Sequence, residues 1–385
     1  MCGITGVVGP EAAASINAMT DALTHRGPDS QGTWHHDGVA LGARRLAIVD
    51  VRGGRQPMVA GAHVLVANGE IYNYRSLRTE LESLGDSFST HCDVEVILHG
   101  VRRFGTAFLE RLRGFFAFAL WDGDEQTLLL ARDRFGIAPL VWTTIGAHFV
   151  FASEVKAFER VDGWEAELNH AALGDYLTHR YVLGPETLFK GVQHVPHGHW
   201  MMRKADGSLH TQRWYRYPQA RKDALSLAEA TERLEEALER SVARRRQGEV
   251  PVGLYLSGGL DSSLIAAISA AQGEALPAFS HGFDPTADET SAACEVAEHL
   301  GMSLTRANIT PDSLLELPKI IRAMEQPVAN SDVVGLWQLA HHASQDVTVV
   351  LCGEGADELF GSYPHQQLLA VLEAVPRPAL QAGRQ

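Results

Sequence analysis

The feature that most constrains the fold of this chain is a change in its hydrophobic periodicity near residue 215. Before that point, short apolar or alternating runs bounded by Gly, Asp or Asn predict strands that pair among themselves, with a few helices between them. Beyond it, helices and strands alternate, which predicts a doubly wound parallel sheet with helices on both faces. A chain of 385 residues is also too long for one ordinary core. We therefore predict two domains, residues 1–215 and residues 226–385.

The first domain reads as an α+β layered structure. Its predicted strands are residues 63–68, 114–122, 127–132 and 148–153. Its predicted helices are residues 16–26, 74–85 and 93–105. The polar segment 214–226, which carries a proline, interrupts this pattern, and we place the domain boundary there.

In the second domain the helices and strands follow one another in a regular order. The predicted elements are a helix at 227–245, a strand at 252–256, a helix at 261–271, a strand at 277–283, a helix at 293–301 and a strand at 347–355. The basic run Arg244–Arg246 falls at the end of the first helix, where positive charge suits the helix dipole. The alternative, a nucleic-acid contact, is disfavoured by the formal net charge of −14.

A cysteine stands directly behind the initiator methionine. A free thiol on a mobile chain end oxidises easily, so its placement there needs a reason. One reason would be a small residue that starts a buried strand. The chemical alternative is that removal of Met1 gives Cys2 both a thiol and a free α-amine, which are a nucleophile and a base in one residue.

Several classes of protein are excluded by composition and spacing. No stretch approaches the ~20 apolar residues of a membrane span, and the start of the chain lacks the pattern of a signal peptide. We therefore expect a cytoplasmic protein with no membrane partner. The four cysteines are scattered without C-x-x-C pairing, which argues against a disulfide framework or a zinc site.

Residues 254–267, LYLSGGLDSSLIAA, run from a predicted strand through two glycines into a helix. Gly258 and Gly259 let the backbone approach an anion, and the helix start offers unpaired N–H groups. The lysine of a Walker loop is missing. Asp261 would repel a phosphate unless a cation stood between them, and Mg²⁺ fits that need. The segment therefore predicts a nucleotide-phosphate loop rather than a tight turn with a capping Asp.

A second glycine turn follows the predicted strand at 347–355 and carries Glu354, Asp357 and Glu358. In a doubly wound sheet this turn would face the same crevice as the first loop, where its carboxylates would handle a metal or a proton. Taken alone, the turn reads equally well as a solvated loop.

Six motifs occur in one order along the chain. They are MCGITG, HRGPDS, RRLAIVD, NGEIYNY, SGGLDSS and GEGADELFGSY. Together they resemble the glutamine-hydrolysing asparagine synthetases, and the resemblance covers nearly the whole chain. It implies an N-terminal-nucleophile glutaminase domain, a sandwich of two antiparallel sheets between helices (αββα), joined to an ATP-pyrophosphatase domain. It also implies an ATP-dependent ligase of amino-acid biosynthesis.

In the first domain, the resemblance implies that Cys2 attacks the side-chain amide of glutamine and holds a thioester while ammonia leaves. The oxyanion hole would be formed by Asn68 and Gly69, a side-chain amide and a backbone N–H. An α-amine titrates close to the thiol, so it could relay a proton at neutral pH.

The resemblance also implies a glutamine site. It would consist of Arg45, Leu46, Ala47, Ile48, Val49, Asn68, Gly69, Glu70 and Asp93. Arg45 would pair with the substrate carboxylate, while Glu70 and Asp93 would hold its ammonium group. Arg26 would have a structural or gating role.

In the second domain, the resemblance implies an ATP site. It would consist of Leu256, Ser257, Gly258, Gly259, Asp261, Ser262, Ser263, His281, Cys352 and Gly353. Asp261 and Asp357 would hold Mg²⁺, and Glu354 would act on the acceptor or on the attacking ammonia. A carboxylate, with aspartate as the first candidate, would form an acyl-adenylate and release pyrophosphate. Ammonia from the first site would then displace AMP.

The chain departs from the family pattern in three places. Cys352 and Ala356 stand where the family usually has Ser. The chain also stops at Gln385, whereas the family continues through a helical region. We therefore expect a truncated synthetase domain, with either a homodimer or a partner chain that supplies the missing region.

Two alternatives to an asparagine synthetase stay open at this stage. One is the same chemistry on another carboxylic acid of a biosynthetic pathway. The other is a glutaminase that supplies ammonia to a partner while its own synthetase half is incomplete. A relative with an inactive glutaminase is disfavoured, because Cys2 and its expected partners are all present.

Overall fold

The structure is a computed structural model that describes residues 1–218, 225–273, 275–282, 290–327, 330 and 332–374. It divides into two compact units. Unit 1 comprises Met1–Glu229, Arg244–Val250 and Leu314–Val334, and unit 2 comprises Ala230–Ala243, Pro251–Ser313 and Gly335–Gln385. Part of the predicted boundary segment and the chain end after residue 374 lie outside the described residues, so the boundary stays a prediction.

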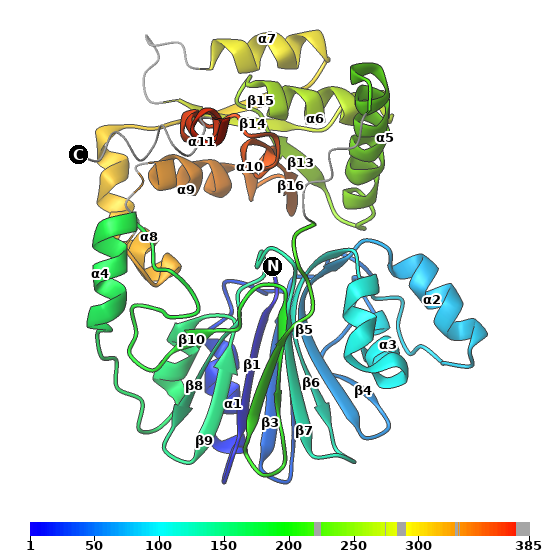
Figure 1. Ribbon diagram of the computed structural model, residues 1–385, viewed down its shortest axis with the longest axis vertical. Helices are drawn as coiled ribbons and strands as arrows, with labels where there is room; N and C mark the ends of the chain where they lie inside the picture. The colour runs from blue at the N-terminus through cyan, green and yellow to red at the C-terminus, as the bar shows by residue number, and fades with distance from the viewer. Residues whose placement is uncertain (219–224, 274, 283–289, 328–329, 331, 375–385) are drawn as a thin grey trace. The chain divides into compact units, whose positions relative to one another are not determined.

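Unit 1 is built on two six-stranded antiparallel sheets (Figure 1). The first has the order β10-β8-β9-β1-β3-β2, with β1 (Gly3–Val8), β2 (Ser30–His36), β3 (Val39–Arg45), β8 (Val141–Ile145), β9 (His148–Ala152) and β10 (Gln193–His194). The second has the order β12-β11-β7-β6-β5-β4, with β4 (Met58–Ala60), β5 (His63–Ile71), β6 (Gly114–Asp122), β7 (Thr127–Arg132), β11 (His199–Arg203) and β12 (Leu209–Arg213).

Helices cover both outer faces of this pair of sheets. The helical elements of unit 1 are α1 (Ala13–Asp21), α2 (Tyr74–Ser83), α3 (Glu95–Phe104), η1 (Gly105–Arg111), η2 (Val155–Arg160), α4 (His170–His179) and α8 (Leu317–Met324). Helix α1 packs on β1 and β3 of the first sheet, and α3 packs on β4 and β5 of the second. The layers therefore run helix, sheet, sheet, helix, which confirms the predicted αββα sandwich.

The period-two pattern of the strands explains this layering. Along β6, Phe116 and Phe118 pack towards the helices α2 and α3, whereas Ala117 and Ala119 pack between the two sheets. Large side chains thus fill the space under the helices, and small ones let the sheets approach each other. A third core cluster fills the space between α1 and the first sheet.

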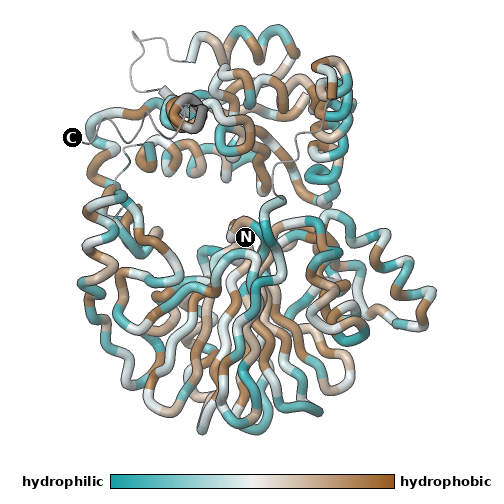
Figure 2. The backbone as a smooth tube through the Cα atoms, in the orientation of Figure 1, coloured by the Kyte–Doolittle hydropathy of each residue, from teal (hydrophilic) through white to brown (hydrophobic). Residues whose placement is uncertain are grey.

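Unit 2 contains a four-stranded parallel sheet in the order β15-β14-β13-β16. Its strands are β13 (Val252–Tyr255), β14 (Ala278–Gly282), β15 (Leu304–Asn308) and β16 (Val349–Leu351). The helical elements of this half of the chain are α5 (Leu227–Arg245), α6 (Leu260–Ala271), α7 (Ser291–His299), η3 (Pro311–Glu316), α9 (Asp332–Ala343), α10 (Ala356–Phe360) and α11 (Pro364–Ala374). Figure 2 shows hydrophilic and hydrophobic residues alternating along α5, as its leucine spacing predicts.

Both faces of the parallel sheet are covered. Leu254 and Ala278 belong to the core cluster that α5, α6 and α7 complete, whereas Phe279 of the adjacent position packs against α9. The predicted doubly wound sheet is therefore confirmed. The strand order reverses between β13 and β16, and that is where ligands of such sheets bind.

One predicted helix is too long. Residues 16–26 were expected to be helical, but α1 ends at Asp21 and only isolated turns follow, closed by Thr24 and Arg26 N–H groups. Just beyond these turns, Gly27 packs directly on the backbone of Arg44, where a Cβ would lie 2.3 Å from the Arg44 carbonyl carbon. The following Pro28 also disfavours helical geometry in the residue before it.

Candidate active site

A pocket of about 410 Å³ opens beside Cys2 in unit 1, and we call it the Cys2 pocket. It is lined by Met1, Cys2, Arg45, Leu46, Ile48, Val49, Gln56, Asn68, Gly69, Glu70, Cys92, Asp93, Val94 and Phe115. Every residue expected to catalyse or bind in the first domain lies here except Ala47. The N–H of Ala47 instead donates to Asp29 at 2.8 Å, which fixes the loop behind the pocket.

The end of β5 provides the two groups expected to stabilise an oxyanion. Asn68 is fully buried, and neither its Oδ1 nor its Nδ2 has a hydrogen-bond partner among the described residues. Burying an amide without hydrogen-bond partners destabilises the folded chain by ~1–3 kcal/mol. An asparagine at this position therefore indicates that a ligand forms the hydrogen bonds that the protein leaves open. Gly69 follows with φ +154°, and a Cβ there would lie 2.2 Å from the carbonyl oxygen of Phe115. Only glycine fits that close approach of two strands.

Arg45 is the last residue of β3 and is 4% exposed. Its guanidinium donates to three successive carbonyl oxygens, those of Val49 and Asp50 at 2.8 Å and that of Val51 at 3.3 Å. The loop after Arg45 thus curls around the side chain and fixes it at the pocket wall. Nη2 donates to two of these oxygens and Nη1 to the third, so the second N–H of Nη1 can still donate to a carboxylate.

The same loop is held from outside by Glu249. One carboxylate oxygen accepts from the N–H of Asp50 at 3.0 Å and the other from the N–H of Val51 at 3.3 Å. The N–H of Glu249 in turn donates to the carbonyl of Ile48 at 2.8 Å. Residues just after α5 therefore fasten the loop that positions Arg45.

Two neighbouring carboxyl groups in the pocket have raised pKa values. Burial, together with the charge of Asp93, raises the pKa of Glu70 to about 7. Burial also raises the pKa of Asp93, although the N–H of Ile71 donates to it at 2.7 Å. Two adjacent carboxyls that ionise reluctantly form a site for a cation such as an ammonium group.

Cys2 lies just before β1, and its Sγ points to the carbonyl of Leu46 at 3.7 Å. Burial raises the pKa of the Cys2 thiol, and burial also lowers the pKa of the Met1 amine. With Met1 attached, the nitrogen of Cys2 is an amide and offers no base. The thiol therefore needs either a base or the loss of Met1 before it can act as a nucleophile.

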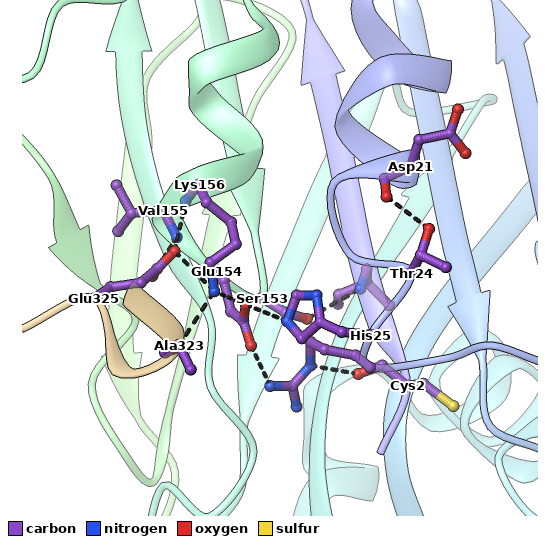
Figure 3. A network of polar contacts seen from close by, with 12 residues as sticks. Cys2, Asp21, Thr24, His25, Ser153, Glu154, Val155, Lys156, Ala323 and Glu325 are labelled. Atoms are coloured by element: carbon purple, nitrogen blue, oxygen red, sulfur yellow. Dashed lines mark hydrogen bonds and ion pairs between the residues drawn. The ribbon is translucent and has the colours of Figure 1, made fainter. Parts of the chain in front are cut away.

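Figure 3 shows a polar network behind Cys2. Nε of Arg26 donates to the Cys2 carbonyl at 2.9 Å, and Nη1 of Arg26 donates to Glu154 at 2.6 Å. His25 and Lys156 also contact the Glu154 carboxylate. Burial opposes ionisation of Glu154, but the hydrogen bond from His25, the charge of Arg26 and the hydrogen bonds from Lys156 and Arg26 outweigh it and lower its pKa to about 2. Arg26 thus has the structural role expected of it within this network, whereas a gating role stays a prediction.

Sequence reasoning missed several residues of the Cys2 pocket. Gln56 forms two hydrogen bonds with the backbone of Ala67, directly before Asn68, at 3.0 and 2.6 Å. Cys92 and Phe115 line the wall. Arg245, in the basic run at the end of α5, does not line the pocket, but its guanidinium lies 4.7 Å from the centre of the Tyr72 ring and its charge acts on Glu70 of the pocket. No motif marks these residues, because the fold brings them together from distant parts of the chain.

A second pocket, of about 1140 Å³, lies in unit 2 at the carboxyl ends of β13 and β16, and we call it the switch-point pocket. It is lined by Tyr255, Leu256, Ser257, Gly259, Asp261, Ser262, Phe279, Ser280, His281, Leu339, Cys352, Gly353, Glu354, Gly355, Asp357, Glu358 and Tyr363. The two glycine loops meet here: a Cβ on Gly353 would lie 3.0 Å from the Cβ of Asp261. Of the expected ATP-site residues, only Gly258 and Ser263 do not line the pocket.

Gly258 has a different task. It adopts φ +79°, and a Cβ there would lie 2.5 Å from the side chain of Ala292 at the start of α7. The glycine therefore lets the loop fold tightly onto α7. Within the loop, the Ser257 and Ser262 hydroxyls lie 3.0 Å apart, and the N–H of Gly259 points to Ser257 at 3.2 Å. This compact turn presents backbone N–H groups at the start of α6.

The carboxylates of the switch-point pocket can provide some, but not all, of the ligands of a hard divalent cation. Asp261 and Asp357 both line it, and Ser362 donates to Asp357. Within the described residues, no three His, Cys, Asp or Glu side chains converge into a metal cage. Mg²⁺ needs only one or two protein carboxylates when phosphate oxygens complete its shell, so this donor set fits Mg²⁺ that arrives with a nucleotide.

Among the residues that the structure describes, no helix combines the length and apolar content needed to cross a bilayer.

Comparisons with known proteins match both halves of the chain. Residues 1–215 match the family model of a glutamine amidotransferase domain, and residues 233–384 match that of asparagine synthase. A putative asparagine synthetase (glutamine-hydrolyzing) of Mycobacterium tuberculosis (strain ATCC 25618 / H37Rv) is 38% identical over 393 residues, which cover 94% of this chain and 60% of the relative. Asparagine synthetase (glutamine-hydrolyzing) 1 of Bacillus subtilis (strain 168) is 37% identical over 378 residues, with 94% and 59% covered.

A relative with a different name is similar over the same region. Amidase chry2 of Gibberella zeae is 32% identical over 376 residues, which cover 90% of this chain and 55% of the relative. The chain therefore spans between 55% and 60% of the length of these three curated relatives.

Proposed function

The chain belongs to the family of glutamine-hydrolysing asparagine synthetases, and we propose that it converts a carboxylate into an amide with nitrogen taken from glutamine. In this proposal the Cys2 pocket hydrolyses glutamine, and the switch-point pocket activates the acceptor with ATP. The observation that carries the proposal is the presence in one pocket of Cys2 and of the buried Asn68 amide, which has no hydrogen-bond partner within the described part of the chain.

Glutamine hydrolysis begins once Met1 has been removed. The α-amine of Cys2 takes the thiol proton, and Sγ attacks the amide carbon of glutamine. The developing oxyanion accepts hydrogen bonds from the side-chain N–H of Asn68 and the backbone N–H of Gly69. The C–N bond breaks, ammonia leaves with the proton from the amine, and water then hydrolyses the thioester to glutamate.

The ends of the substrate match the charges of the pocket. Arg45 is the only cationic side chain among the residues that line it, and it would hold the α-carboxylate of glutamine. Glu70 and Asp93 would hold the α-ammonium, whose charge restores the ionised forms that burial disfavours.

In the switch-point pocket, the loop from Ser257 to Ser263 would cradle the phosphates of ATP, with Leu256, His281 and Gly353 against the nucleoside. An oxygen of the acceptor carboxylate attacks the α-phosphorus, and pyrophosphate leaves. Ammonia then attacks the acyl carbon, AMP leaves, and Glu354 takes the proton that ammonia releases. Mg²⁺ bound by Asp261 and Asp357 would neutralise the phosphate charge.

Aspartate is the proposed acceptor, because two of the relatives are named asparagine synthetases. A second candidate is another carboxylic acid, and the similarity to a protein named amidase supports it. The residues of the switch-point pocket include Glu354, Glu358 and His281. None of them by itself chooses between the two acceptors.

The test is to supply the folded chain with glutamine, ATP, Mg²⁺ and aspartate, and to measure glutamate, AMP, pyrophosphate and asparagine. Production of all four supports the proposal, and the Cys2→Ala variant should lose only the glutamine-dependent part. If aspartate gives no asparagine, but another supplied carboxylic acid is converted into its amide with release of glutamate and AMP, the second acceptor would be favoured. Absence of every product from the folded chain would refute both.

A further inference from the structure

The segment Leu314–Val334 lies within the part of the chain that matches asparagine synthase, yet it packs into unit 1. Its helix α8 ends at Met324 and is capped by Glu325, which adopts the left-handed conformation with φ +60°. Glycine is the usual residue at such a position, because a Cβ crowds the following carbonyl oxygen in that conformation. A glutamate here therefore calls for a contact that offsets the strain.

The contact is made by both oxygens of the Glu325 carboxylate (Figure 3). The N–H of Val155 and the N–H of Lys156 each donate to it at 2.6 Å, and the Lys156 ammonium lies 3.5 Å away. The Glu325 side chain is only 14% exposed. These N–H groups belong to the first turn of η2 and have no partner inside that helix, so Glu325 fixes where η2 begins.

The residues just before η2 are bound to the chain around Cys2. Arg26 donates hydrogen bonds both to the Glu154 carboxylate and to the Cys2 carbonyl, so it links these two residues. Ser153 makes two further bonds to Ile4, with its N–H donating to the Ile4 carbonyl at 2.9 Å and its hydroxyl accepting from the Ile4 N–H at 3.0 Å. The segment 153–156 is therefore tied to the nucleophile on one side and to Glu325 on the other.

We propose that Glu325 is a positioning residue for Cys2, acting through Lys156, Glu154 and Arg26. A carboxylate from the asparagine synthase half of the chain thereby sets the geometry of the nucleophile in the other half. This inference rests on the proposed function, since it gives Cys2 its importance. It adds a specific dependence: glutamine hydrolysis requires α8 to be docked with Glu325 in place.

The distinguishing experiment compares two cysteines of unit 1 in the Glu325→Gln variant. Gln keeps one acceptor but places an NH₂ group against the second backbone N–H and gives up the charge that faces Lys156. The proposal expects iodoacetamide to alkylate Cys2 at least about threefold faster than in the parent chain, because a loosened Cys2 gains solvent and its thiol ionises more readily. Cys92 lines the wall of the same pocket but is 5% exposed and packs into the core, so it should keep its rate.

Peptide mass spectrometry reads both sites in one sample, and intact mass confirms that both preparations carry the same N-terminus. An unchanged Cys2 rate would overturn the proposal. Equal acceleration of Cys2 and Cys92 would also overturn it, because it would show that Glu325 merely stabilises the unit as a whole. This readout needs no turnover, so a parent chain that fails to hydrolyse glutamine would refute the proposed function without deciding this point.

Steady-state kinetics and a double variant provide a second test of the proposal. In a chain that hydrolyses glutamine, Glu325→Gln should lower kcat by about tenfold while KM changes by less than about twofold, because orientation of the nucleophile and not substrate binding is lost. Glu154→Gln should accelerate Cys2 alkylation too, and the double variant should be no faster than Glu154→Gln alone. Additive effects would show that Glu325 acts by another route and would overturn the proposal.

The chain offers two matched controls. Asp122 also accepts from two successive backbone N–H groups, those of Asp124 and Glu125 at 3.0 and 3.1 Å, but it lies at the end of β6 opposite to Phe115 of the Cys2 pocket. Asp122→Asn should therefore leave the alkylation of Cys2 unchanged. Glu236 forms an exposed ion pair with Arg240 on α5, and Glu236→Gln should change neither readout. Acceleration of Cys2 in both controls would overturn the assignment to Glu325.

Discussion

The two pockets of this chain are built in opposite ways. In the Cys2 pocket, the side chains expected to act come from paired strands and their ends and, for Asp93, from the turn before α3, and Asn68, Arg45 and Asp93 are all at least 95% buried. In the switch-point pocket, most of them come from the loops after parallel strands and from the first turns of α6 and α10, and Ser257 and Glu354 are exposed. The Cys2 pocket is also the smaller of the two, with a volume of about 410 Å³ against about 1140 Å³ for the switch-point pocket.

This difference bears on how each pocket would use its residues. Packing and hydrogen bonds hold the Cys2 pocket in one arrangement before any ligand binds, which is the preorganisation that stabilises a transition state. The switch-point pocket holds several carboxylates whose charge requires a cation and phosphates to balance it. Substitutions in the first pocket should therefore reduce the rate of chemistry, and those in the second should mainly weaken binding.

The largest expected effect comes from Cys2→Ala. Loss of a hydrolase nucleophile costs on the order of 10⁶ in rate in a serine protease, so glutamine-dependent product should fall to background. Product formed from added ammonia should persist, since the switch-point pocket keeps all its residues. Assays of both nitrogen sources on one preparation measure this. If product formation fell equally with glutamine and with ammonia, the proposal that the two pockets catalyse separate reactions would be wrong.

The next effect is that of Asn68→Ala. Removing one oxyanion donor typically lowers kcat by about 10²–10³. KM for glutamine should change little, because the substrate ends are expected to bind at Arg45 and at the carboxylates. Steady-state glutamate release gives both constants. A rise in KM at constant kcat would contradict the preorganised pocket and make Asn68 a simple binding residue.

Gly258→Ala tests the loop-built pocket. The new Cβ would meet Ala292 at 2.5 Å in a backbone conformation that alanine disfavours, so the loop must shift. We expect KM for ATP to rise by about 10–100-fold, while glutamine hydrolysis stays within about twofold of the parent. Gly259→Ala is the matched control. Gly259 has φ −70° and its Cβ would approach only the Ser257 hydroxyl, at 3.3 Å, so its effect should be smaller.

Much of the fold could be predicted from periodicity alone. Strand β6 and helix α5 carry strong period-two and helical patterns, because each buries apolar side chains on defined faces. Strand β2 could not be predicted in this way. It is an edge strand whose residues alternate between exposed and half-buried, and its sequence SQGTWHH contains a single large apolar residue. Edge strands bury too little to leave a clear hydrophobic signal.

The site could be predicted where the residues lie in compact motifs. The NGE and SGGLDSS segments hold their groups within a few positions of each other, so local sequence is enough. The network from Glu325 to Cys2 could not be found in the same way. Its contacts join residues 170 and 128 positions apart in the chain, and they form only because Glu325 docks on the start of η2 and β9 pairs with β1. Such contacts leave no motif in a single sequence.

The pH dependence of glutamine binding tests whether burial controls the charge of the carboxyl groups in the Cys2 pocket, which distinguishes this pocket from the more exposed switch-point pocket. Because the pKa of Glu70 is about 7, its carboxyl is protonated below that pH and must lose a proton to pair with the substrate ammonium. The dissociation constant should therefore rise by about tenfold for each pH unit below 7 and become flat above it. Calorimetry on the Cys2→Ala variant measures binding without turnover. Glu70→Gln should bind glutamine more weakly, and its affinity should no longer fall in that range.

The smallest expected effect is that of Cys352→Ser. Cys352 follows β16, is exposed and lines the switch-point pocket, where the resemblance to the family leads one to expect a serine. The two side chains are similar in size, and an exposed substitution of this kind changes free energies by less than ~0.5 kcal/mol. KM for ATP, measured by pyrophosphate release, should therefore stay within about twofold, as it should in the Cys294→Ser control. A change of tenfold or more would mean that this loop-built pocket is as finely fixed as the Cys2 pocket, because only a position whose neighbours cannot adjust would respond to the exchange of one atom.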